Sequence, residues 1–92
     1  MVYAYVLITI AIGKVKEVLE ELRSLDSVIQ ADVVTGPYDA IARIQAPDLS
    51  ELTKTIVQRI HYIDGVIDTT TAIGVEMRRN AIQGERLSGQ KI

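Results

Sequence analysis

Residues 2 to 12 constrain the fold more than any other part of this 92-residue chain. Their sequence is VYAYVLITIAI, which is rich in β-branched and aromatic side chains and stops at Gly13, so it predicts a β-strand. Successive side chains of a strand point to opposite faces, and here both faces are apolar. We therefore expect a strand that is covered on both sides. Its predicted faces are Val2, Ala4, Val6, Ile8 and Ile10 on one side, and Tyr3, Tyr5 and Leu7 on the other.

The following segment changes from a strand pattern to a helical one and back. Apolar residues recur at helical spacing between Gly13 and Leu25, which predicts an amphipathic helix. Residues 28–35 and 38–46 predict two further strands, and Gly36-Pro37 between them is a strong turn signal. Because the connection is short, these two strands are expected to form an antiparallel hairpin.

A second helix and a fourth strand complete the pattern. Asp48, with Glu51 three residues later, predicts a capped helix start, and Asp64-Gly65 predicts the helix end. Residues 66–77 are dense in Val, Ile and Thr and predict the last strand. The apolar stripes of the two helices are Val15, Val18, Leu19, Leu22 and Leu25, and Leu49, Leu52, Ile56, Ile60 and Ile63.

The resulting order, β-α-β-β-α-β, predicts an α+β fold of the ferredoxin-like type. In this fold a four-stranded antiparallel sheet carries both helices on one face, its first and third strands are central, and its second and fourth strands are edges. The other face of the sheet is left open, with Tyr3, Tyr5 and Leu7 on it. A chain this short gains limited stability alone, so we expect this face to pack on a second copy, as in dimeric α/β-barrel proteins.

Composition excludes several classes of function. The chain has no cysteine and one histidine, so we expect neither a disulfide framework nor a metal site, and no other cofactor is indicated. Ten basic and twelve acidic residues give a net charge of −2, which argues against direct nucleic-acid binding. No apolar run approaches the roughly 20 residues of a membrane-spanning helix, so we expect a cytoplasmic protein without a membrane partner.

The charge is distributed unevenly along the chain. Residues 1–77 carry six basic and eleven acidic residues, whereas residues 78–92 carry four basic residues and one acidic residue. We therefore divide the chain into one domain at 1–77 and a polar, basic C-terminal tail at 78–92. The tail is expected to be mobile unless an assembly orders it.

The sequence offers no set of catalytic residues. Neither a phosphate-binding glycine motif nor a nucleophile elbow is present. His61 follows Ile60 of the predicted buried stripe, and we interpret it as a partly exposed structural residue rather than a general base.

Polar residues at the periphery of the predicted sheet are more informative. Asp39 opens the third strand after the turn, and Thr69 to Thr71 lie in the fourth strand, where a ligand or a neighbouring molecule can bind. Two simpler explanations stay open. β-propensity alone accounts for a threonine run, and an Asx-type contact with its own backbone accounts for an aspartate after a turn.

Two short motifs stand about 25 residues apart. The first is a turn glycine followed by Tyr-Asp at the entry to a strand, in VVTGPYDAIARI (33–44). The second is Gly-Val-x-x-Thr-x-Thr, in IDGVIDTTTAIGV (63–75), and the helix opening DLSELTKTIV (48–57) lies between them. Residues 2–77, through these segments, resemble the effector-binding (RAM) module of the Lrp/AsnC family, the leucine-responsive and asparagine regulators of transcription. The matching residues are Gly36, Tyr38 and Asp39, and Gly65, Val66, Thr69 and Thr71.

The resemblance implies a function and a site. Members form dimers by sheet packing, often four dimers in a ring, and bind amino acids or similar small molecules in clefts between dimers. Carried over, Asp39 would accept hydrogen bonds from a ligand ammonium, while Thr69, Thr71 and backbone groups near Gly36 would meet a carboxylate. The rest of the 35–39 turn would line the cleft, including Thr35 and Tyr38.

Regulators of this family carry a helix-turn-helix DNA-binding domain before the module, whereas here Met1 is followed directly by the first strand. We therefore expect a stand-alone module without a DNA-binding domain, one that senses an amino acid and modulates a full-length Lrp/AsnC regulator by mixing subunits with it.

Two alternatives stay open. Small enzymes use the same paired-sheet fold, with catalytic residues in the cavity between helices and sheet. The orientation of the His61 side chain distinguishes such an enzyme from a ligand-binding module. The other alternative is a purely structural assembly protein with empty clefts.

Overall fold

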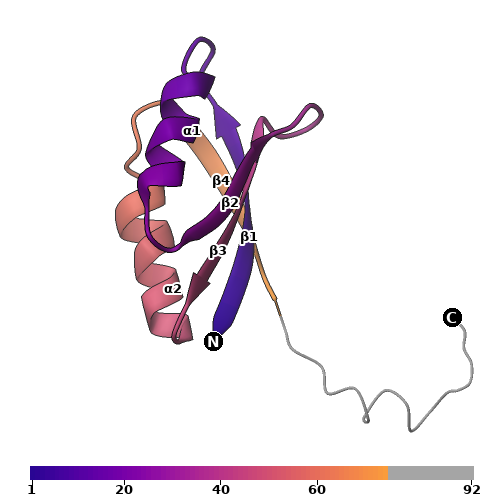
Figure 1. Cartoon of the computed structure of the whole chain (residues 1–92). Helices are drawn as coiled ribbons and strands as arrows, with labels where there is room; N and C mark the ends of the chain where they lie inside the picture. The colour runs from indigo at the N-terminus through magenta and orange to yellow at the C-terminus, as the bar shows by residue number, and fades with distance from the viewer. Residues whose placement is uncertain (75–92) are drawn as a thin grey trace, which may run out of the picture.

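The computed structural model describes residues 1–74 and contains the predicted β-α-β-β-α-β order (Figure 1). The tail predicted at 78–92, and the last residues of the strand predicted at 66–77, lie outside the described residues. Among the residues described, no helix is long and apolar enough to cross a membrane. The elements are β1 (Val2–Ile10), α1 (Val15–Ser24), β2 (Val28–Val33), β3 (Ala40–Ala46), α2 (Leu49–Thr55) with its continuation η1 (Ile56–Ile60), and β4 (Val66–Ile73).

The four strands form one antiparallel sheet in the order β2-β3-β1-β4, so the predicted central and edge positions are confirmed. Val6 of β1 pairs with Ala42 of β3 on one side and with Thr71 of β4 on the other. Both helices lie on the same face of the sheet, and no helix or strand among residues 1–74 covers the opposite face (Figure 1). The ferredoxin-like sandwich is therefore the fold of this chain.

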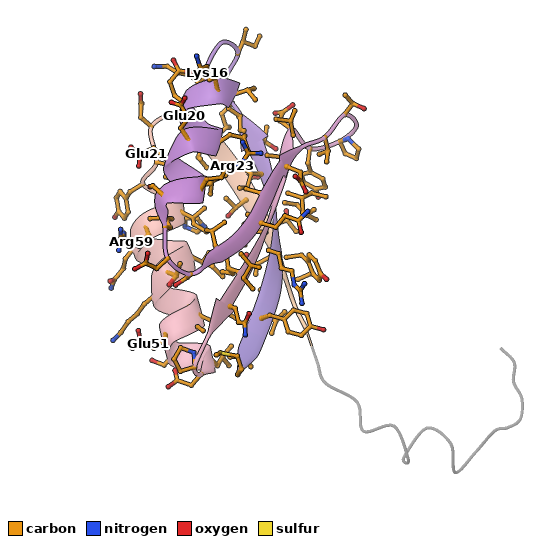
Figure 2. All side chains as sticks on the ribbon, viewed as in Figure 1. Lys16, Glu20, Glu21, Arg23, Glu51 and Arg59 are labelled. Carbon is orange, nitrogen blue, oxygen red and sulfur yellow. The ribbon has the colours of Figure 1, made fainter. Side chains whose placement is uncertain are left out.

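The core lies between the helices and the sheet. Alternate residues of β1 and β3 point into it because a strand has a period of two, and the apolar stripes of the helices cover them. Charged residues of the helices point outward, among them Glu20, Glu21 and Arg59 (Figure 2). The buried residues are Ala4, Val6, Ile8, Ile10, Val18, Leu19, Leu22, Ala31, Ala40, Ala42, Ile44, Ala46, Leu52, Ile56, Ile60 and Ile63.

The second helix follows its predicted start but not its predicted course. The Asp48 side chain accepts a hydrogen bond of 2.9 Å from the Glu51 N–H, which confirms the cap. The prediction that Leu49 is buried was wrong: it is 52% exposed and is the first residue of α2. From Ile56 to Ile60 the helix widens into a π-turn, closed by the His61 N–H donating to the Ile56 carbonyl at 3.0 Å.

The open face of the sheet presents the aromatic residues of β1. Tyr3 and Tyr5 pack edge to face with their ring centres 6.0 Å apart, and the Arg43 guanidinium lies 5.2 Å from the centre of the Tyr3 ring. Tyr5 is 42% exposed, whereas Tyr3 and Leu7 are half-buried. The predicted orientation of these three residues, away from the helices, is thus confirmed. Their cross-strand neighbours on this face are mixed: Ile41 and Ala72 are apolar, whereas Arg43, Gln45 and Thr70 are charged or polar.

The edge strand β2 is protected by an arginine of the neighbouring helix. Arg23 lies on the side of α1 that faces β2 (Figure 2), and its guanidinium donates to the Ala31 carbonyl from Nη2 at 2.6 Å and from Nε at 3.1 Å. A capped carbonyl is less available for pairing with another strand.

Gly65 holds the loop before β4 against the start of α1. Its carbonyl accepts a hydrogen bond of 2.8 Å from the Ala11 N–H, and its φ of +101° lies in the region that favours glycine. A Cβ at this position would lie 2.8 Å from the Lys14 Cβ and 3.0 Å from a methyl of Val18. Gly13 also has a positive φ, +83°, but a Cβ there would meet nothing within 4 Å.

Alanine substitutions at Gly13 and Gly65 distinguish the loss of stability caused by backbone strain from the loss caused by a steric clash. Gly65→Ala is expected to lower the free energy of unfolding by about 2–4 kcal/mol, because it adds steric overlap to strain. Gly13→Ala is expected to lower it by about 1–2 kcal/mol through strain alone. Urea unfolding at one protein concentration measures both, and an equal or smaller loss for Gly65→Ala would contradict the packing described here.

Candidate functional site

Asp39, directly before β3, is linked by hydrogen bonds to the end of β1. Its backbone N–H donates to the Ile8 carbonyl at 2.8 Å, and its carbonyl accepts from the Val34 N–H at 3.0 Å. Its carboxylate oxygen Oδ2 accepts from the Ile10 N–H at 2.8 Å, next to the point where the β1–β4 register shifts. The β1–β3 ladder ends at the pair Ile8–Ala40, so the Asp39 side chain gives the Ile10 N–H a partner beyond the last ladder pair and stabilises the strand end.

Half of the Asp39 carboxylate therefore has a structural role. The contact is made to a neighbouring strand, not to the turn of Asp39 itself, as an Asx-type turn would require. The other oxygen, Oδ1, accepts no hydrogen bond from the residues that the structure describes. With the side chain half-buried at the end of the sheet, Oδ1 is the atom that remains for a ligand.

The turn before Asp39 projects from the end of the hairpin (Figure 1). Gly36 has a φ of +138°, a conformation that side chains rarely adopt, although a Cβ would meet nothing within 4 Å. Thr35 and Gly36 are exposed, and Tyr38 is half-buried. The four residues predicted from this segment, Thr35, Gly36, Tyr38 and Asp39, are thus close in space, and we call them the turn half-site.

The threonine run of β4 is divided between the two faces of the sheet. Thr69 pairs with Ile8 and Thr71 with Val6, so both lie on the helix-covered side of the edge strand. Thr70 pairs with Leu7 and lies on the open side, away from the other two. The motif Thr-x-Thr therefore places two half-buried hydroxyls on one side, and we call Thr69 and Thr71 the strand half-site.

His61 joins the strand half-site, although its sequence context predicted a structural residue. Its ring nitrogen Nε2 lies 2.7 Å from Thr69 Oγ1, and the side chain is exposed at the β4 edge. It does not point into the space between helices and sheet. The sequence did contain a signal for this proximity: His61 lies at the end of the helix that precedes β4.

An open pocket of about 260 Å³ lies at this edge. It is small compared with the pockets that bind drug-sized molecules, and its size suits a compact metabolite. Val66, Ile67 and Asp68 complete its lining, and sequence reasoning identified none of the three as pocket residues. The lining consists of His61, Val66, Ile67, Asp68 and Thr69.

The two half-sites share one end of the sheet but are separated by β1. The Asp39 N–H bonds to the Ile8 carbonyl on one side of β1, and Thr69 pairs with Ile8 on the other. Two strand spacings of about 4.8 Å put them roughly 10 Å apart. Within one chain, the backbone of β1 therefore lies between the two half-sites.

Comparison with known proteins identifies the domain that carries these features. The model of the Lrp/AsnC ligand binding domain matches residues 3–79. An uncharacterised helix-turn-helix transcriptional regulator of Pyrococcus abyssi is 32% identical over 78 residues, which are 85% of this chain and 49% of that protein. The chain spans about half the length of the curated relatives it matches.

Solved structures agree with the family match. The crystal structure of a hypothetical protein from Pyrococcus horikoshii is 34% identical, with a TM-score of 0.78 over 84% of this chain and 93% of that chain. Escherichia coli AsnC is 26% identical, with a TM-score of 0.77 over 84% of this chain and 54% of that chain. Since the fold, the two motifs and the family match cover the same residues, this chain belongs to the Lrp/AsnC ligand-binding domain family.

Proposed function

We propose that this chain binds an amino acid, or a similar small molecule with an ammonium and a carboxylate, and that it assembles with further copies to do so. The observation that carries the proposal is the Asp39 carboxylate, which is held by one oxygen on the Ile10 N–H. A carboxylate fixed in this way is pre-organised to accept hydrogen bonds from a ligand ammonium with its other oxygen.

The separation of the half-sites supports a binding cleft made by more than one chain. Within one chain Asp39 and Thr69 lie on opposite sides of β1. A ligand that meets both kinds of group takes one of them, in our proposal, from a neighbouring chain. In our proposal, copies pair through the open face that carries Tyr3, Tyr5 and Leu7. Dimers then meet so that the turn half-site of one faces the strand half-site of another, and a ring of four dimers satisfies every half-site.

A role in binding is favoured over a role in catalysis. An enzyme with this fold is expected to place its reactive groups between the helices and the sheet, whereas His61 lies exposed at the β4 edge. The family to which the chain belongs is described by ligand binding, which supports the same choice.

We further propose that the chain modulates a full-length regulator. Relatives such as the Pyrococcus abyssi protein are helix-turn-helix transcriptional regulators, and the part of them that this chain matches is about half of their length. Two chains that share the same domain surfaces are able to form mixed assemblies. In such assemblies the ligand state of this chain would influence the arrangement of the regulator.

Asp39 offers a test that separates ligand binding from folding. Asp39→Asn keeps an oxygen for the Ile10 N–H but loses the charge, so it is expected to change stability by less than about 1 kcal/mol and to weaken amino-acid binding at least roughly tenfold. Asp39→Ala is expected to cost about 1–3 kcal/mol of stability as well.

Isothermal titration with each of the common amino acids, alongside urea unfolding, gives both quantities. No heat from any amino acid with the wild-type protein would reject the ligand class. Unchanged affinity in Asp39→Asn would reject the role of Asp39.

The open face is tested by a charge placed in its centre. Tyr5→Glu is expected to convert the protein to a monomer at micromolar concentration, because the carboxylate would lose its water in the contact, a cost that the Arg43 guanidinium opposite it offsets only in part. The matched control is Tyr62→Glu, which replaces a tyrosine that is 81% exposed and lies away from this face, and it is expected to keep the dimer. Light scattering reports the mass, and a monomeric wild type or a dimeric Tyr5→Glu protein would contradict the pairing.

Mixed assembly is tested by co-expression with a full-length Lrp/AsnC regulator from the same organism. Native mass spectrometry is expected to show species that contain both chains. With Tyr5→Glu in this chain, the mixed species are expected to disappear. Complete separation of the two wild-type proteins would count against the regulatory role, while leaving ligand binding in place.

A further inference from the structure

We propose that His61 is a positioning residue that sets the direction of the Thr69 hydroxyl, so that its O–H points into the pocket as a donor for a ligand carboxylate. This inference rests on the proposed function and adds a residue to it. The contact that carries it is the 2.7 Å distance between His61 Nε2 and Thr69 Oγ1.

Two elements of the chain place these atoms together. His61 directly follows the π-turn, whose last hydrogen bond is made by the His61 N–H itself. π-turns inside helices occur often at functional sites. Thr69 is fixed from the other direction, because it pairs with Ile8 in the sheet. The helix end and the edge strand are thus held independently, and the hydrogen bond joins them at the mouth of the pocket.

The direction of this hydrogen bond decides what the pocket can bind. A threonine hydroxyl has one proton to donate and lone pairs to accept with. If Nε2 carries a proton and donates to Oγ1, the threonine O–H stays free for an acceptor such as a carboxylate. If Nε2 carries none, the threonine donates its only proton to the ring, and the pocket is left with acceptors.

The charges around the pocket make the first arrangement necessary for a carboxylate ligand. Asp68 lines the pocket, and its Oδ1 already accepts from the Thr69 N–H at 2.9 Å. Asp64 lies in the preceding loop and is paired with the Lys14 Nζ at 3.2 Å, so this cation is engaged. Of the five residues that line the pocket, only His61 and Thr69 have side chains that donate hydrogen bonds. A carboxylate that approaches two acidic residues therefore depends on this pair.

The arrangement is testable without any ligand, because the chain has a single histidine and its imidazole nitrogen signals are free of overlap. In ¹⁵N NMR of the neutral ring, we expect Nε2 to carry the proton. Thr69→Val, which removes Oγ1 and keeps the shape, is expected to shift the Nε2 resonance. Thr71→Val, on the same side of the same strand, is the control and is expected to leave it unchanged. An unprotonated Nε2, or an Nε2 resonance that does not shift in the Thr69→Val variant, would overturn the proposal.

Ligand binding gives the second readout, with the amino acids used as probes. His61→Gln retains an amide that donates from a similar position and is expected to keep the affinity within about threefold, whereas His61→Phe is expected to lose roughly tenfold. The loss should be smaller for the carboxamide derivative of the same amino acid, because its neutral carbonyl oxygen accepts a weaker hydrogen bond than a carboxylate does. An equal loss for acid and amide would overturn the proposal. Absence of binding by the wild-type protein would reject the proposed function, and the NMR result would still decide the direction of the hydrogen bond.

Discussion

The strand β1, apolar on both faces, is the constraint on which the rest of this structure depends. Ala4, Val6 and Ile8 have no exposed surface, because the two helices cover that side of the sheet. The other side, with Tyr3 and Tyr5, is not covered by any helix or strand of the part of the chain that the structure describes. Since β1 also pairs with both β3 and β4, its far end positions the turn that carries Asp39 and the strand that carries Thr69. The same strand therefore determines the packing of the core and the positions of Asp39 and Thr69.

That geometry gives the chain two incomplete sites in place of one complete site. One is built around a carboxylate held by a backbone N–H, and the other around a hydroxyl held by an imidazole. In the proposed function the first meets a ligand cation and the second a ligand anion, and β1 lies between them within one chain. If a second chain supplies the other half, as we propose, assembly is a condition for binding, and a change in either process affects the other.

The sequence predicted the parts of the structure that follow from local pattern. Hydrophobic periodicity and turn residues predicted the order of the elements, the central position of β1 and β3, and the Asp48 cap. The structure confirms all three. Hydrophobic periodicity does not define the ends of a helix, so the exposure of Leu49 and the π-turn were not predicted. The division of the threonine run follows from strand alternation once the register is known. The partners of Asp39 and of His61 lie on other elements, and no local pattern encodes them.

A native mass spectrum of the protein purified without added ligand tests the central claim most directly, because it reports the ligand and the number of chains in the same species. If binding needs groups from more than one dimer, a mass of amino-acid size accompanies assemblies larger than a dimer and is absent from monomers and isolated dimers. The same mass retained on the monomer would contradict it, since one chain would then hold a complete site.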